Sequence, residues 1–184
     1  MIPYRTSLAA ALTTGILVLS FGPRAQAATD PAGPQQFLTK AAQGGLAEIK
    51  LSALAKSKTQ SAEVRKIAQE MVTDHGKSNA NLESIARTKG LIVPQEIDSS
   101  HQATFDTLSA QSDEAFDSAY LDAMKKDHAG AIALFEAEAG SADKDSGLKA
   151  FAVKTLPTLK MHRSMLNKAM AARGSRRLTI GKRQ

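Results

Sequence analysis

Apolar residues recur at intervals of three and four over most of the chain, which is the spacing of an amphipathic helix rather than of a strand. No proline interrupts the chain between Pro34 and Pro94 or between Pro94 and Pro157, and this also favours long helices. We therefore expect an all-α fold. Its main helices are predicted at residues 34–58, 61–90, 112–139 and 145–173.

Several residues of the types that start and stop helices set the expected ends. Ser61 and Ser112 are predicted to cap helix N-termini, and Gly90 can take the left-handed conformation that closes a helix. The fourth helix is expected to stop at Gly174. Pro157 lies inside that helix, where it removes one backbone hydrogen bond and should bend the axis.

The connections between the helices predict the topology. Short connections join the first helix to the second and the third to the fourth, so each pair should form an antiparallel hairpin. Residues 91–111, between the hairpins, are numerous enough to cross the length of a bundle and can include a short helix at 100–109. The second and third helices would then run parallel. We expect a ferritin-like four-helix bundle with one long crossover between helices 2 and 3.

Each predicted helix carries one strong metal-ligand type near the midpoint of its apolar face. Because the midpoints of bundled helices lie at similar heights, these side chains should meet in one layer. Three imidazoles and one carboxylate suit a single Cu, Zn or Fe ion, although they could also satisfy one another by hydrogen bonds. The four residues are Glu48, His75, His128 and His162.

The motif Met-x-x-Asp-His occurs twice, before His75 and before His128. The methionines precede the histidines by one turn on the same faces, where their thioethers would favour Cu(I) or simply fill the core. The aspartates point about 100° away from those faces, so they either orient a histidine of a neighbouring helix or are surface charges. These residues are Met71, Met124, Asp74 and Asp127.

Four glycines lie within about a turn of the layer, although glycine inside a helix costs roughly 1 kcal/mol relative to alanine. Close packing of helices and space for a ligand explain them equally well. They are Gly44, Gly45, Gly76 and Gly130. His101, in the crossover, is assigned no role.

The chemistry of a di-iron carboxylate bundle is not expected. That site needs Glu-x-x-His on two helices, and the positions three residues before the histidines hold Val72, Lys125 and Leu159 instead. The sequence has no Gly-rich phosphate loop, nucleophile elbow or thiol. A binding function is therefore favoured over an enzymatic one, with catalysis at an open metal position left as an alternative.

Residues 1–27 are predicted to be a signal peptide. Arg5 supplies a positive start, an apolar run follows at residues 8–21, and Ala25–Ala27 form a small-x-small cleavage site. The run is shorter than the roughly 20 residues that a spanning helix needs, and the absence of cysteine excludes a lipid anchor and disulfides. We expect a periplasmic or secreted bacterial protein with a bundle domain at residues 28–172 and no transmembrane segment in the mature chain.

The basic charge is concentrated at the end of the chain. The formal net charge is +6, and residues 173–184 contain basic side chains but no acidic ones. This tail is predicted to be disordered, or alternatively to bind an anionic surface such as lipid phosphates. The lack of Trp and the low aromatic content argue against nucleic-acid binding.

The segments "VRKIAQEMVTDHGKSNANLESIARTKG" and "LKAFAVKTLPTLKMH" resemble secreted bacterial proteins grouped as domain-of-unknown-function family 4142. The likeness extends over about residues 35–170 and includes the four layer residues and both Met-x-x-Asp-His motifs. It implies a ferritin-like helical bundle and export, but no established activity. "MKKDHAGAI" is also loosely similar to a motif of another periplasmic family linked to copper, which usually has paired histidines.

We therefore expect an exported bundle that binds one transition-metal ion in its central layer, for metal buffering or stress protection. The alternative is a non-enzymatic envelope-stress or interaction protein whose buried His/Glu layer only fixes the register of the helices. Neither prediction names a protein partner.

Overall fold

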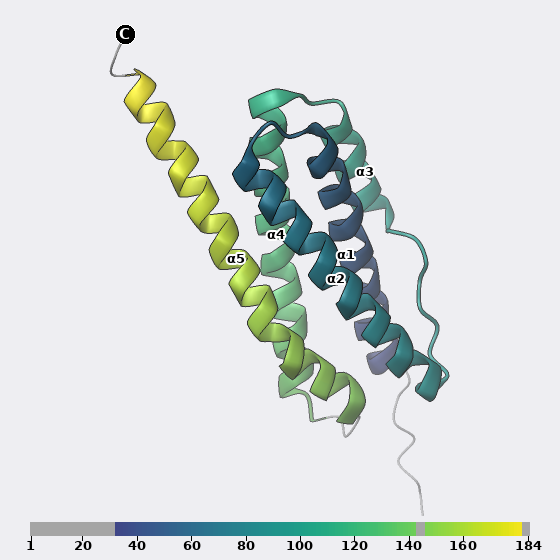
Figure 1. The fold of residues 1–184 in the computed structure, drawn as a ribbon. Helices are drawn as coiled ribbons and strands as arrows, with labels where there is room; N and C mark the ends of the chain where they lie inside the picture. The colour runs from purple at the N-terminus through teal and green to yellow at the C-terminus, as the bar shows by residue number, and fades with distance from the viewer. Residues whose placement is uncertain (1–31, 143–145, 182–184) are drawn as a thin grey trace, which may run out of the picture.

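The computed structural model describes residues 32–142 and 146–181, which form helices joined by turns and loops and contain no strand (Figure 1). The all-α prediction is therefore confirmed for this part of the chain. The helices are α1 (Ala32–Lys58), α2 (Ala62–Lys89), α3 (Ser99–Ser109), α4 (Asp113–Gly140) and α5 (Ser146–Gly181).

The four long helices pack as two hairpins. Helix α1 packs against α2 and α4 against α5, and the hairpins meet through contacts of α1 with α4 and of α2 with α5. Figure 1 shows α2 and α4 running in the same direction, because the connection after α2 returns along the bundle before α4 begins. A helical bundle with parallel second and third long helices is thus observed, whereas its relation to ferritins stays a prediction.

The crossover contains the expected short helix, and this helix lies against the bundle. Asp98 is the N-cap of α3, and its side chain accepts a hydrogen bond from the backbone N–H of His101 at 3.0 Å. Helix α3 contacts both α1 and α4, and Lys50 of α1 donates to Gln102 at 2.9 Å. The crossover therefore brings His101 next to the main helices.

The ends of α2 follow the sequence signals, but the start of α4 does not. The Ser61 hydroxyl accepts from the Val64 N–H at 3.3 Å, and Gly90 closes α2 with φ of 66°. Ser112 stands at the N-cap position of α4, yet its side chain makes no capping hydrogen bond. The prediction that the Ser112 side chain caps the helix is therefore wrong. Asp113, the first residue of α4, has a φ of 52°, and this left-handed backbone conformation directs the Ser112 side chain away from the N–H groups of the first turn.

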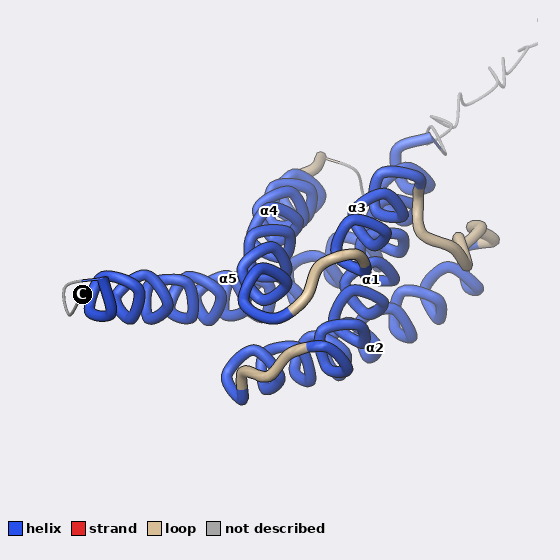
Figure 2. The backbone as a smooth tube through the Cα atoms, turned by 90° about the horizontal axis from the view of Figure 1, so that it is seen from above, coloured by secondary structure: helices blue, strands red, loops and turns tan. Residues whose placement is uncertain are grey.

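The predicted end of the fourth long helix at Gly174 is also wrong. Helix α5 continues to Gly181, and its C-terminal part projects beyond the other helices in Figures 1 and 2. One glycine costs a helix only about 1 kcal/mol, which is too little to stop it by itself. One residue before Gly174, Arg173 of α5 forms an ion pair with Asp117 of α4, with 3.2 Å between Nη1 and Oδ2.

The predicted signal peptide lies outside the described residues, as do positions 182–184 of the basic tail. The division of the chain into signal peptide, bundle and tail therefore stays a prediction. In the part of the chain that the structure describes, no helix combines the length and the apolar character required to cross a membrane.

Two apolar clusters fill the interior of the bundle, one toward each end. The first contains Leu51, Ala55, Val64, Ile67, Ala68, Met71, Leu108, Phe116, Tyr120, Leu121, Met124, Leu166 and Ala169. The second contains Phe37, Leu38, Ala41, Ala42, Leu82, Ala86, Ile132, Phe135, Leu148, Phe151, Ala152 and Leu159. On every long helix the predicted layer residue lies between members of the two clusters, so a polar layer separates the two apolar parts of the core.

Candidate metal centre

The polar layer receives one side chain from each long helix. Glu48, His75, His128 and His162 are 2%, 6%, 0% and 0% exposed. The three imidazole rings have centroids 5.3–5.5 Å apart, and each offers a ligand nitrogen within 4.8 Å of the others. The structure thus brings together all four residues that the sequence placed in one layer.

Glu48 lies between two of the histidines. Its Oε2 is 2.6 Å from Nε2 of His75, and its Oε1 is 3.3 Å from Nδ1 of His128. The first contact is an ion pair without hydrogen-bond geometry, and His75 Nε2 has no hydrogen-bond partner among the described residues. Burial by itself raises the pKa of Glu48, but the adjacent histidines outweigh burial and hold that pKa below its usual value.

Hydrogen bonds fix which nitrogens of His128 and His162 carry protons. The Met124 carbonyl can only accept, so Nδ1 of His128, 2.9 Å away, is the donor. The Asp74 carboxylate also accepts. Nε2 of His162, which lies 3.1 Å from Oδ2 of Asp74, is therefore the donor. In the neutral rings His128 Nε2 and His162 Nδ1 are then both acceptors, and they face each other at 3.2 Å. Two lone pairs this close repel each other, and a proton or a cation between them would relieve that repulsion.

A proton is a poor candidate for that position at neutral pH. Burial lowers the pKa of His128, and the Glu48 carboxylate only partly offsets this effect. Burial, with the neighbouring His75, lowers the pKa of His162 to about 4. His75 differs, because although burial lowers its pKa, the Glu48 carboxylate raises it above the ordinary value. The layer therefore has one histidine that favours its charged form and two that favour the neutral form.

The residues of the two Met-x-x-Asp-His motifs have different surroundings. Asp74 orients His162 on a neighbouring helix, which is one of the two roles expected for it. Asp127 instead lies toward α3, with its Oδ1 4.0 Å from Nε2 of His101. Met71 and Met124 are fully buried members of the first apolar cluster, so both contribute to the core beside the layer.

A cavity of about 520 Å³ adjoins the layer, and Glu48 and His75 form part of its wall. Gly44 and Gly130 also line it, and a Cβ atom at either position would meet no atom within 4 Å. At Gly45 a Cβ would lie 2.2 Å from Oδ1 of Asn79, so this glycine leaves room for the Asn79 side chain of α2. Gly44 and Gly130 thus border open space, whereas Gly45 accommodates a side chain of the neighbouring helix.

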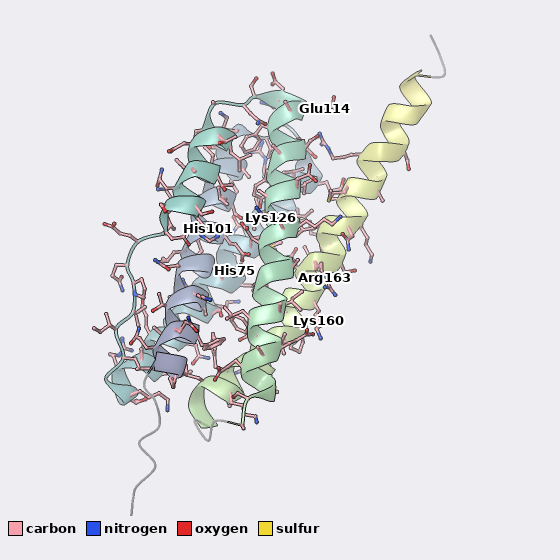
Figure 3. All side chains as sticks on the ribbon, turned by 180° about the vertical axis from the view of Figure 1, so that it is seen from behind. His75, His101, Glu114, Lys126, Lys160 and Arg163 are labelled. Carbon is pink, nitrogen blue, oxygen red and sulfur yellow. The ribbon has the colours of Figure 1, made fainter. Side chains whose placement is uncertain are left out.

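The sequence interpretation missed the cavity and two polar residues beside it, His101 and Asp98. His101 lines the cavity, and its Nδ1 lies 2.6 Å from Oδ2 of Asp98. Figure 3 shows His75 and His101 near mid-height of the bundle, with Lys126 of α4 close by. The Asp-x-x-His spacing at the start of α3 was a usable signal, because an N-cap carboxylate can reach a side chain three residues later.

Comparisons with known proteins support the fold. The model of a family described as Domain of unknown function (DUF4142) matches residues 21–169, whereas the comparison with curated proteins gives no match. A crystal structure of a DUF305 fragment from Deinococcus radiodurans has a TM-score of 0.68 at 18% identity, covering 76% of this chain and 96% of that one. A DUF305 protein from Streptomyces coelicolor, described as a candidate secreted protein, has a TM-score of 0.66 at 14% identity, covering 78% and 92%. These structures share the fold.

Proposed function

Because the chain belongs to the DUF4142 family, a domain of unknown function, we propose a function for it from the chemistry of its central layer. The protein is a metal-binding helical bundle that holds one transition-metal ion at Glu48, His75, His128 and His162. It buffers that metal, or protects against metal-related stress, outside the cytoplasm. Its ferritin-like character is part of the same proposal, supported by the single long crossover and the ligands at mid-bundle.

The observation that carries the proposal is the pair of facing nitrogens, His128 Nε2 and His162 Nδ1, at 3.2 Å. Two ligands on one ion at 2.0–2.1 Å in tetrahedral geometry stand roughly 3.3–3.4 Å apart. The outer nitrogen of each ring is held by an acceptor, as is usual for metal-binding histidines. His75 and Glu48 supply the remaining ligands after a small movement that separates His75 Nε2 from Glu48 Oε2, which lie 2.6 Å apart.

The ligand set favours Cu, Zn or Fe over Mg or Ca, because three of its four members are imidazoles. Nearby Met71 and Met124 would add preference for Cu(I) if a thioether reached the ion. The role is binding rather than catalysis, since the ligands are buried and the Glu-x-x-His pattern of di-iron oxygenases is missing. Export is supported by the predicted signal peptide at residues 1–27 and by the secreted description of one structural neighbour.

The second candidate is a layer that is purely structural, in an interaction or envelope-stress protein. The close Glu48–His75 ion pair favours it, because a charged His75 and an ionised Glu48 neutralise each other without a metal. Such a layer would fix the register of the helices at little or no gain in stability.

Metal analysis of untagged protein distinguishes the candidates. Protein reconstituted with Cu, Zn or Fe and then desalted should retain close to one ion per chain of at least one of these metals. His162→Gln should lose this ion, because the amide fills similar volume without an imidazole nitrogen. Lys160→Gln, on the exposed side of the same helix, is the matched control and should retain it.

Absence of stoichiometric metal from the wild-type protein after all three reconstitutions would contradict the proposal. The structural alternative would then be supported if apolar replacement of all four layer residues left the fold intact and equally stable.

A further inference from the structure

The cavity beside the central layer has a second set of potential ligands at its more exposed end. The His101 and Asp127 side chains are 22% and 20% exposed, whereas those of His75 and Glu48, in the same cavity wall, are 8% and 3% exposed. The cavity therefore extends from a partly solvated His–Asp pair to the buried layer.

The ring of His101 is held in the orientation typical of a metal ligand. Its Nδ1 lies 2.6 Å from Oδ2 of Asp98, and because a carboxylate accepts, Nδ1 is the donor. The other carboxylate oxygen of Asp98 accepts from the His101 backbone N–H, so the aspartate itself is fixed. In the neutral ring Nε2 then has a free lone pair. A carboxylate that binds the outer nitrogen of a histidine in this way is a recurring partner of metal-bound imidazole.

Nε2 of His101 lies opposite the Asp127 carboxylate, one oxygen of which has no hydrogen-bond partner among the described residues. Oδ1 of Asp127 lies 4.0 Å from that nitrogen, which is too far for a hydrogen bond. The second oxygen, Oδ2, is shielded from solvent and has no hydrogen-bond partner among the described residues. Burial and the nearby Glu48 carboxylate both raise the pKa of Asp127, as expected for an acidic group without a sufficient counter-charge.

We propose that His101 and Asp127 form a second, outer cation site at the mouth of the cavity, which binds a divalent transition-metal ion such as Zn²⁺. A small rotation of the partly exposed Asp127 side chain would shorten the 4.0 Å gap to the roughly 3.4 Å between two ligands of one tetrahedral ion. Water completes the coordination, so this site is weaker than the central one. It is separate from the layer and does not require the layer to bind metal.

Zn²⁺ titration of the full chain, followed by NMR of the imidazole nitrogens, tests the outer site. The chain has only four histidines, so the His101 signals can be assigned with a His101→Gln variant. Zn²⁺ should shift Nε2 of His101, while Nδ1 stays protonated and bound to Asp98. This shift should occur whether or not the signals of the three layer histidines change, which separates the outer site from the central proposal.

Variants on one helix provide the matched comparison. Asp127→Asn should weaken Zn²⁺ binding at His101 by about tenfold or more, because the amide loses the charge and most of the ligand strength. Asp122→Asn removes the same charge from an exposed position of α4 and should leave the His101 shift unchanged. Far-ultraviolet circular dichroism checks that both variants keep the wild-type helicity.

Two results would overturn the outer site. One is a wild-type protein whose His101 signals do not respond to several equivalents of Zn²⁺, including the case of a His101 ring that carries protons on both nitrogens at neutral pH. The other is an Asp127→Asn variant that binds Zn²⁺ at His101 as tightly as the wild type.

Discussion

His162 and His75 belong to the same buried layer, yet burial and charge move their pKa values in opposite directions. Burial dominates at His162 and lowers its pKa to about 4, whereas the Glu48 carboxylate dominates at His75 and raises its pKa. Without metal, His75 and His162 therefore make the free energy of unfolding depend on pH in opposite directions. The contribution of His75 is greatest below pH 6.5 and is lost as the pH rises through its raised pKa.

The effect of His162 has the opposite sign. The unfolded chain binds a proton at this residue near pH 6.5, but the folded chain binds it only near pH 4. Between these values the unfolded state holds more protons, so the free energy of unfolding falls as the pH falls.

We predict that His162→Gln reduces this acid sensitivity in metal-free protein. The slope of unfolding free energy against pH, between pH 6.5 and pH 4, should decrease by up to about 1.4 kcal/mol per pH unit. Urea unfolding at several pH values in the presence of a chelator measures it. An unchanged slope would show that His162 already titrates normally in the folded protein.

At the scale of the helices, two adjacent glycines of α1 have different surroundings although their helix propensities are equal. A Cβ atom on Gly44 would meet no atom within 4 Å, whereas a Cβ atom on Gly45 would overlap Oδ1 of Asn79 at 2.2 Å. Asn79 lies on α2 and donates to the Ala42 carbonyl at 3.4 Å, so it links the two helices of the first hairpin.

We predict that Gly44→Ala stabilises the protein by up to about 1 kcal/mol, the difference in helix propensity between the two residues. Gly45→Ala should be less stable than Gly44→Ala by about 1 kcal/mol or more. The added methyl group would displace the Asn79 side chain and break its hydrogen bond to the Ala42 carbonyl. Chemical denaturation of the two variants side by side provides the comparison. Equal stabilisation by both would contradict the contact between the Asn79 side chain and Gly45.

At the scale of the whole molecule, the central layer connects all four long helices at one height. Glu48 contacts His75 and His128, His128 contacts His162, and His162 contacts Asp74. An ion bound at this layer would therefore join both hairpins and bind the folded chain far better than the unfolded one.

We predict that the metal of the central layer raises the melting temperature of the protein. An ion at 100 times its dissociation constant stabilises the folded state by about 2.7 kcal/mol, which corresponds to roughly 5–10 °C for a chain of this size. Thermal unfolding with and without metal measures the shift. His162→Gln should lose most of it and Lys160→Gln should keep it, while an equal shift in all three proteins would indicate binding elsewhere.

The sequence by itself determined the helices and the heights of their ligands. Helical spacing and the absence of proline depend on local geometry, so the extents of α1, α2 and α4 could be predicted to within a few residues. The convergence of Glu48 with the three histidines followed from their positions near the midpoints of the helices. The end of α5 was not predictable in this way, because one glycine is too weak a signal to stop a helix.

Only the tertiary structure decided how the polar groups pair across the helices. Asp74 and Asp127 occupy equivalent places in identical motifs, yet one contacts His162 and the other faces His101. The difference arises because the two aspartates meet different neighbours: Asp74 lies on the side of α2 that contacts α5, whereas Asp127 lies on the side of α4 that contacts α3 rather than α5. The cavity likewise depends on helix packing, since whether a glycine leaves open space or permits close contact is set by the neighbouring helix and not by its own sequence.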